Sequence, residues 1–179
     1  TFPLPIVLSV KGGNAMAKSL SRTDEEIAEI YSRQVKAVYR VCFAYMKNAA
    51  DTEDAVSDTF VKMLRSGTSF ESEEHERAWL IRTASNVCKD MLKHWWHKRE
   101  NLEDYEQQGT GPMEIDETLQ AVMALPEKYK TVVYLYYYEG YTSVEISKIL
   151  LKPQSTIRNY LSEARNVLRE RLGDDFNEE

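Results

Sequence analysis

The sequence predicts an all-α protein with two small helical domains, and three observations favour this fold class. Apolar residues recur at steps of three and four along most of the chain, which is the period of one buried helix face. No long stretch alternates apolar and polar residues as a half-buried strand does. The 179 residues include only 7 glycines and 5 prolines, which favours long helices over a turn-rich sandwich.

Residues 24–99 are expected to form the first domain, a bundle of three helices. Apolar residues at helical spacing mark the first helix over residues 27–46. A polar break then offers Asp51 or Thr52 as the N-cap of the second helix, which we expect to stop at Gly67. A short loop leads into a third helix, which carries many basic residues.

Residues 116–172 are expected to form the second domain, and local signals mark its helix boundaries. A short helix ends at a Leu-Pro pair, and another runs to Gly140, a candidate C′ residue. Thr142 and Glu145 fit a capping box that opens the next helix. The Leu-Lys-Pro turn after that helix lacks the usual glycine, and we expect Ser155 to cap the last helix.

Three segments lie outside these domains. Residues 1–15 precede Met16 and lack the basic start of a secretory signal, so we expect vector-derived or disordered sequence there. Residues 100–115 are acidic and aperiodic, as expected of a flexible linker, and residues 173–179 form an acidic tail. No apolar run approaches the ~20 residues that a membrane-spanning helix needs.

The net charge of −6 argues against a nucleic-acid partner until it is divided along the chain. Residues 77–99 carry +5 and residues 152–172 carry +3, whereas residues 100–117 carry −7 and the tail carries −4. Two basic islands therefore lie in an acidic chain, and each coincides with a predicted helix.

The second island lies on a helix-turn-helix pattern, formed by residues 143–150 and the helix from Ser155. On the outer face of such a helix, arginine can bind a guanine edge and asparagine an adenine edge in the major groove. The candidate DNA-reading residues are Ser155, Thr156, Arg158, Asn159, Ser162 and Arg165. The alternative is an ordinary helical hairpin with a solvated polar face.

The first island interleaves tryptophans with basic residues on one helix. Unstacked bases stack on aromatic rings while phosphates contact lysines, so this pattern suits single-stranded nucleic acid. The residues concerned include Trp79, Arg82, Lys89 and Lys93. The alternative for Trp79 is a core anchor, with the lysines serving only to solubilise the helix.

Two motif blocks identify a family resemblance that covers about residues 24–172. The segments DTEDAVSDTFVKML (residues 51–64) and RAWLIRTASN (residues 77–86) closely resemble conserved region 2 of bacterial sigma factors. The segment LPEKYKTVVYLYYYEGY (residues 125–141), with the helix-turn-helix after it, resembles region 4. With only a short linker between them, the chain is similar to the extracytoplasmic-function sigma factors (group IV) of the sigma-70 family.

The resemblance implies a transcription initiation factor and not an enzyme. Such a cytoplasmic bacterial factor binds core RNA polymerase and directs promoter recognition, promoter melting and initiation, here of a stress- or envelope-responsive regulon. An anti-sigma factor is an expected further partner, and the free chain is expected to be monomeric. A stand-alone helix-turn-helix regulator and a helical interaction scaffold are the alternatives.

The resemblance also implies residue roles. Contacts with the clamp helices of the largest polymerase subunit fall on Asp54, Ala55, Asp58, Thr59 and Phe60. Together with the first basic island, it assigns the minus-10 element to Phe70, Trp79, Ile81, Arg82, Asn86, Lys89, Asp90 and Lys93. Asn86 suits the edge of a flipped base, and Asp90 stands where the family often has asparagine. The helix from Ser155 is expected to read the minus-35 element.

The linker length agrees with two separate DNA boxes. Its 16 residues reach at most ~55 Å when fully extended, a distance of roughly 16 base pairs. Its acidic side chains are expected to keep it extended and off the DNA. It either threads a basic channel of polymerase, as the resemblance implies, or serves as a plain solvated spacer.

No other chemistry is supported by the residue patterns, and no cofactor is expected. His94 and His97 have metal-ligand spacing but lack a third ligand nearby. Cys42 and Cys88 lie far apart without a CxxC motif, so neither a disulfide framework nor a zinc ribbon is predicted. Neither a glycine-rich phosphate loop nor a catalytic Ser/His/Asp arrangement is present among only three histidines.

Overall fold

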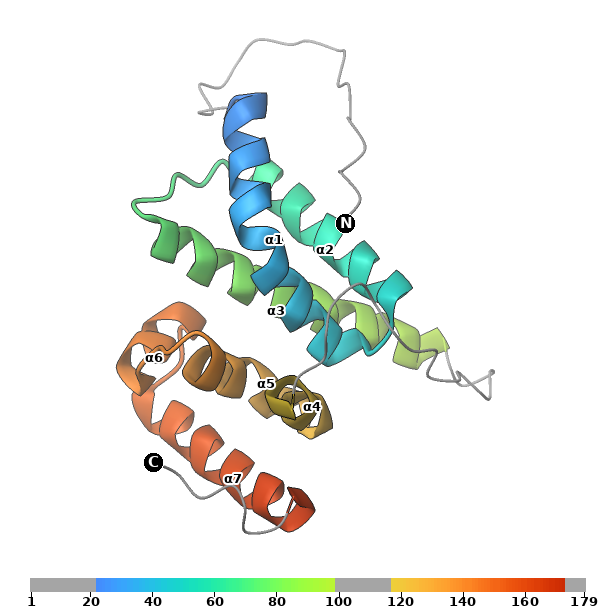
Figure 1. Cartoon of the computed structure of the whole chain (residues 1–179), viewed down its shortest axis with the longest axis vertical. Coiled ribbons are helices and arrows are strands. Elements are labelled where there is room, and N and C mark those ends of the chain that lie inside the picture. Colours follow the sequence, from blue (N-terminus) through green and yellow to red (C-terminus); the bar gives the residue numbers. More distant parts are fainter. Residues whose placement is uncertain (1–21, 99–116, 173–179) are drawn as a thin grey trace.

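The computed structural model describes residues 22–98 and 117–172. Helices α1 (Asp24–Met46), α2 (Ala49–Ser66) and α3 (Glu73–Lys98) form the first bundle. The second contains α4 (Glu117–Ala124), α5 (Glu127–Val133), a π-helical turn η2 (Tyr134–Tyr138), α6 (Ser143–Leu150) and α7 (Gln154–Leu172). Figure 1 shows the two bundles stacked along the long axis of the molecule.

The all-α prediction with two helical domains is confirmed, since the described ranges contain helices and turns and no strand. The expectations for the first 15 residues, the linker and the acidic tail concern segments outside the described residues.

Capping residues explain where the helices of the first bundle begin and end. Thr23 and Glu26 form a capping box at the start of α1. The predicted N-cap of α2 was wrong: Asn48 caps it, because its side-chain oxygen accepts the Asp51 backbone N–H at 2.9 Å. Helix α2 ends as expected at Gly67, which has φ 62°.

The second bundle follows most of its predicted boundaries. The capping box of Thr142 and Glu145 is confirmed at the start of α6, and Gly140 is in the left-handed region at φ 72°. Helix α7 begins at Gln154, so the expected cap at Ser155 was wrong; the Ile157 backbone N–H instead bonds the Pro153 carbonyl at 3.2 Å. The turn between α6 and α7 has no glycine, and Leu151 takes the left-handed conformation there, at φ 53°.

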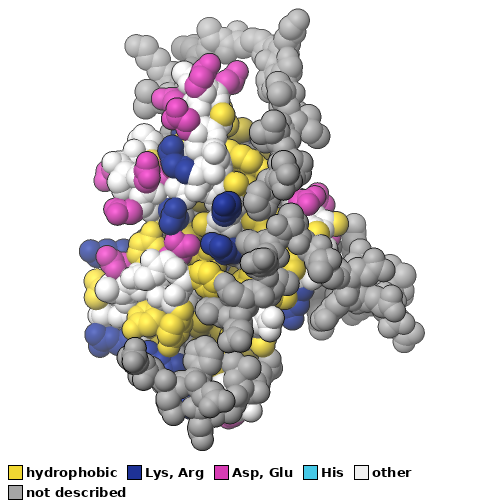
Figure 2. Space-filling view, viewed as in Figure 1, with side chains coloured by type: hydrophobic (Ala, Val, Ile, Leu, Met, Phe, Trp, Pro, Cys, Tyr) yellow, Lys and Arg dark blue, Asp and Glu magenta, His cyan; other side chains and the backbone are white. Residues whose placement is uncertain are grey.

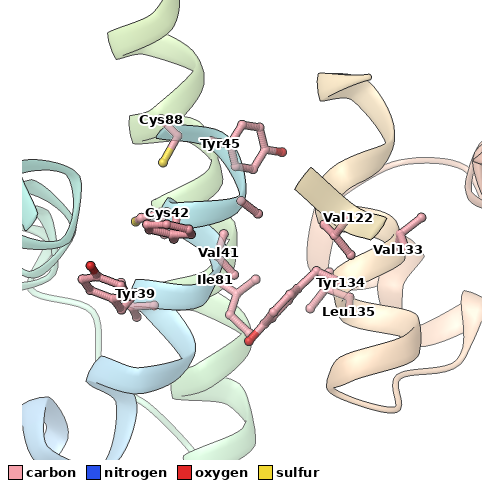
Figure 3. Close-up of a cluster of buried hydrophobic side chains, with 14 of the residues drawn as sticks. Tyr39, Val41, Cys42, Tyr45, Ile81, Cys88, Val122, Val133, Tyr134 and Leu135 are labelled. Carbon is pink, nitrogen blue, oxygen red and sulfur yellow. The ribbon is translucent and has the colours of Figure 1, made fainter. Parts of the chain in front are cut away.

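One continuous apolar core runs through both bundles. In Figure 3, Tyr134 of η2 points across the boundary toward Ile81 of α3, and both side chains are buried. Valines at positions 41 and 122 line the same boundary. The second bundle is therefore packed against α1 and α3, and this placement decides which predicted site residues are exposed.

Candidate nucleic-acid and polymerase interface

Helix α7 separates an apolar face from a polar face. Its buried residues are Ile157, Leu161, Ala164 and Leu168. Its exposed residues Arg158 and Asn159 lie three and four residues after Ser155 and four and three before Ser162, so these side chains form one stripe on the opposite side. The sequence-predicted stripe is thus brought together, except that Thr156 lies beside it and is half-buried.

Two hydrogen bonds fix the helix-turn-helix geometry. Gln154 Nε2 donates to Ser143 Oγ at 3.2 Å, which links the first turns of α6 and α7. Ser147 Oγ donates to the Lys152 carbonyl at 2.7 Å and so closes the turn. Farther along α7, Arg165 Nε donates to Tyr137 Oη at 3.0 Å, so this half-buried guanidinium is oriented by η2.

Helix α3 carries the second polar stripe. Trp79, Arg82, Asn86, Lys89 and Lys93 also follow steps of three and four, and they share one side of the helix. Asn86, Asp90 and Lys93 are exposed, while the other stripe members are half-buried. Ile81 lies on the opposite side, fully buried against the second bundle. Of the predicted minus-10 residues on α3, Ile81 is therefore separated from the exposed group.

Aromatic packing holds the loop before α3. The Phe70 ring lies 5.8 Å from the Trp79 ring and 5.7 Å from the His75 ring, measured between centroids. The Arg22 guanidinium lies 4.6 Å from the Phe70 centroid, and it also donates to the Thr68 carbonyl. Trp79 and Phe70 are both half-buried against the core, so each ring combines a packed side with a partly accessible one.

The predicted polymerase-binding residues of α2 divide by exposure. Ala55 and Thr59 are fully buried, and Thr59 Oγ1 donates to the Ala55 carbonyl at 2.7 Å. Phe60 is buried with its ring centroid 4.8 Å from that of Tyr31. Asp54 and Asp58 are exposed and lie one turn apart, so their carboxylates share the outer surface of α2.

Charge is distributed unevenly over the surface. In Figure 2, acidic side chains gather at the upper ends of the first bundle, and basic side chains gather around the level where the bundles meet. Burial lowers the pKa of Lys89, whose ammonium lies 5.9 Å from the Tyr45 ring centroid. This partly desolvated cation lies on the polar stripe of α3 and at the boundary between the bundles.

Sequence reasoning missed a buried polar network at that boundary. Tyr45, Ser85 and Thr131 are hydrogen-bonded to one another in the interior, and Lys130 is buried beside them. The local sequence signal was weak, because Lys130 and Thr131 stand shortly after the charged pair Glu127 and Lys128 and directly before the apolar run from Val132. The periodicity of apolar residues cannot indicate which distant helix supplies the hydrogen-bond partners of these buried polar side chains.

The described residues also limit other kinds of site. In the two described ranges, no group of three or more His, Cys, Asp or Glu side chains is arranged to hold a metal ion. Cys42 and Cys88 are both buried free thiols. None of the described helices is long and apolar enough to cross a bilayer.

Comparison with known proteins places both bundles in one family. The family model described as Sigma-70 region 2 matches residues 30–97, and that described as Sigma-70, region 4 matches residues 115–168. The two matches together cover more than half of the chain.

Individual proteins show the same relationship. The chain is 25% identical to the ECF RNA polymerase sigma factor SigW of Bacillus subtilis (strain 168), over 88% of this chain and 95% of that protein. It is 27% identical to RNA polymerase sigma factor SigV of the same organism, over 75% of this chain and 83% of that protein.

A solved structure has a similar fold. The sigma factor RpoE from Bartonella quintana, in complex with the anti-sigma factor NepR, aligns with a TM-score of 0.65 at 18% identity, covering 84% of this chain and 99% of that one. The two matched regions lie in order on the two bundles described above, and the chain therefore belongs to the sigma-70 family as an extracytoplasmic-function RNA polymerase sigma factor.

Proposed function

We propose that this chain binds core RNA polymerase and directs it to promoters that have a minus-10 and a minus-35 element. The observation that supports this most directly is the pair of polar stripes, one on each bundle, on α3 and α7. Members of the family are initiation factors and not catalysts, so the chain's task is binding and positioning. The domain limits that we propose are residues 24–99 for region 2 and residues 116–172 for region 4.

In this proposal α3 binds the unwound minus-10 strand. Asn86 is exposed and presents an amide that can pair with the edge of a flipped base. Lys93 is exposed on the same stripe and can contact phosphates, while Phe70 and Trp79 supply rings for stacking. Asp90 lies 3.9 Å from the Lys62 ammonium, with both side chains exposed, so this carboxylate is paired with a cation and does not face the DNA alone.

Helix α7 is proposed to enter the major groove of the minus-35 element. Arg158 and Asn159 supply the guanine- and adenine-type contacts, while Ser155 and Ser162 suit phosphate contacts. Arg165, oriented by Tyr137, lies at the far end of the same stripe. The half-buried Thr156 is proposed to contact the DNA backbone at the edge of the stripe.

The polymerase contact is proposed to centre on the exposed carboxylates of Asp54 and Asp58. The buried Ala55, Thr59 and Phe60 shape the helix that presents these carboxylates. We further propose assignment to group IV, a cytoplasmic location, an anti-sigma partner, a monomeric free state and a stress- or envelope-responsive regulon. Each of these rests on kinship with extracytoplasmic-function factors.

Run-off transcription tests the proposal. The purified chain and core polymerase are combined on a genomic promoter library without any other sigma factor, and promoter-specific transcripts are expected. Asp58→Lys should weaken capture of core polymerase. The matched reversal Glu53→Lys, at an exposed position on another face of α2, should not.

Two other functions make different predictions in the same assays. A stand-alone regulator would bind duplex DNA but would not retain core polymerase in a pull-down. A helical scaffold would show no salt-dependent affinity for DNA. The absence of promoter-specific transcripts with active core polymerase would overturn the sigma-factor proposal.

A further inference from the structure

An arginine from the segment before α1 holds the loop between α2 and α3. Arg22 directly precedes Thr23, the N-cap of α1, and its side chain is half-buried. Its Nη2 donates to the Thr68 carbonyl, and its Nη1 donates to the Met63 carbonyl at 3.5 Å. The Met63 carbonyl belongs to the last turn of α2, where carbonyls lack a partner within the helix and a cation is favoured. The planar guanidinium thus joins the end of α2 to the loop that follows it.

The same guanidinium lies over the ring of Phe70. Its central carbon is 4.6 Å from the Phe70 ring centroid, which is within the range of a cation–π contact. The Phe70 centroid in turn lies 5.8 Å from that of Trp79, with 60° between the ring planes. Arg22 therefore contacts one of the two rings that are proposed above to stack on bases, and that ring contacts the other.

Hydrogen bonds within the loop hold its two ends. At the α2 end, the Thr68 N–H donates to Ser66 Oγ at 3.2 Å. At the α3 end, the Glu71 N–H donates to His75 Nδ1 at 3.3 Å, and the His75 N–H donates to Ser72 Oγ at 3.1 Å. These bonds join residues two to four positions apart, so they do not connect the loop to α1. The guanidinium contacts span 41 to 48 positions and supply that connection.

We propose that Arg22 is a positioning residue for promoter melting, which holds Phe70 and its loop in the arrangement that receives a flipped base of the minus-10 strand. The inference rests on the proposed function. A strand that binds a loop already in place loses less free energy to the ordering of backbone and side chains. Arg22 precedes residues 30–97, the part matched to region 2, so the proposal depends on the contacts of Arg22 in this chain.

Binding of a single strand tests this role. The probe is a fluorescent oligonucleotide that carries one strand of the minus-10 element of a promoter recovered by run-off transcription. The strand used is the one that the unmodified chain, in complex with core polymerase, prefers over a scrambled sequence. Arg22→Ala should weaken binding of this probe by the same complex about 5- to 20-fold, which corresponds to the cost of ordering one or two side chains.

Arg65→Ala is the matched control. It removes the same charge at an exposed position in the last turn of α2, close in sequence to the same loop. Because the structure gives Arg65 no part in holding Phe70, binding of the probe should stay within about twofold of that of the unmodified chain. A loss as large as that of Arg22→Ala would attribute the effect to net charge and overturn the positioning role.

A double-mutant cycle tests whether Arg22 acts through Phe70. If it does, Arg22→Ala should weaken binding less than about twofold when Phe70→Ala is already present. Independent, additive losses would overturn the positioning role, even if each single variant binds the probe weakly. Circular dichroism sets a temperature at which all variants are folded, so that a loss of stability does not enter the comparison.

Salt dependence distinguishes positioning from a direct phosphate contact. Each phosphate contact on a single strand contributes about 0.7 to the slope of log affinity against log salt concentration. Arg22→Ala should leave that slope unchanged, and a slope shallower by about 0.7 would overturn the proposal. Arg22→Lys keeps the charge but not the planar fork, so it should still bind the probe at least about threefold more weakly than the unmodified chain. Binding equal to that of the unmodified chain would contradict the proposed role.

The outcomes separate this role from the proposed function. If the unmodified chain with core polymerase shows no preference for a minus-10 strand over a scrambled one, the proposed function fails and the role of Arg22 fails with it. If binding is sequence-specific and Arg22→Ala stays within about twofold of the unmodified chain, only the positioning role is overturned.

Discussion

At the scale of single residues, Lys130 is the clearest case of a side chain whose chemistry depends on its surroundings. Burial, together with the nearby Lys47, lowers its pKa from 10.5 to about 8. Because the pKa in the folded chain lies below that in the unfolded chain, the native state carries the penalty of a buried ammonium at pH 7. That penalty disappears as the pH rises from about 8 to about 10.5.

Lys130→Met should therefore change stability in a pH-dependent way. The variant's free energy of unfolding, relative to the unmodified chain, should be most favourable near pH 7 and should lose about 3 kcal/mol of that advantage by pH 10.5. Denaturant unfolding at matched pH values measures this difference and cancels the titration of tyrosines and thiols that both chains share. Lys128→Met removes an exposed ammonium whose pKa is raised, so it should not show a trend of this sign. A constant difference for Lys130→Met contradicts the prediction.

Glu76 is a buried carboxylate that joins α3 to α1. It accepts two hydrogen bonds from Arg33, at 2.9 and 2.7 Å, and one from Gln34 at 2.8 Å. Glu76→Ala should destabilise the chain by about 2–4 kcal/mol, because it leaves the buried Gln34 amide and the Arg33 guanidinium without their acceptor. Thermal unfolding followed by circular dichroism tests this, with the exposed Glu74→Ala expected to lie within about 0.5 kcal/mol of the unmodified chain.

Arg158 is predicted to read a base, because it is exposed in the middle of the α7 stripe. Arg158→Ala should cost about 1–3 kcal/mol of binding free energy at one position of the minus-35 element. Binding of the chain–polymerase complex to duplexes substituted one position at a time measures this effect. An equal loss on scrambled duplexes would instead identify Arg158 as a phosphate contact.

At the scale of elements, the α6–α7 turn combines good capping with local strain. Leu151 has φ 53° and ψ 45°, a conformation that disfavours a residue with a Cβ, and 73% of the residue is exposed. Leu151→Gly should stabilise the chain by about 0.5–1 kcal/mol, since relief of strain exceeds the greater flexibility of glycine when unfolded. Lys148→Gly, at an exposed position within α6, should destabilise it by about 1 kcal/mol. Melting temperatures of the two variants should move in opposite directions.

Local signals predicted two helix boundaries correctly. Both the Thr142–Glu145 box and the Gly67 terminus depend only on neighbouring residues. Asn48 was missed because the segment between α1 and α2 contains several polar residues that could cap α2. Which of them forms the cap depends on where α1 ends. Asn48 Nδ2 also donates to the Met46 carbonyl at 3.1 Å, a contact that a choice at Asp51 could not provide.

At the scale of the whole molecule, the Arg77–Glu139 pair tests whether the two bundles are coupled. The Arg77 side chain is partly exposed, so the pair should contribute only about 0.5–1 kcal/mol. A double-mutant cycle with Arg77→Leu and Glu139→Gln measures this coupling by denaturant unfolding. A coupling energy near zero would mean that the bundles do not support each other through this pair.

The sequence alone determined the helical fold class, the order of the elements, the Thr142–Glu145 capping box and the two motif blocks, because each depends on spacings of a few residues. It also indicated the α7 stripe, since exposed and buried positions there alternate with the helix period. The assignment of Ala55, Thr59 and Ile81 as contact residues came with the family motif, and only packing revealed that they are buried.

Only the tertiary structure decided how the two bundles sit together. The partners of Lys130 and Thr131 lie 86 and 46 residues away, respectively, in the other bundle. No local period specifies such a distant partner, because it depends on the fit between two assembled surfaces and on satisfying each polar group that the fit buries. As a result of that fit, Ile81 of the basic helix α3 is fully buried and Lys89 is half-buried, while Asn86 and Lys93 stay exposed.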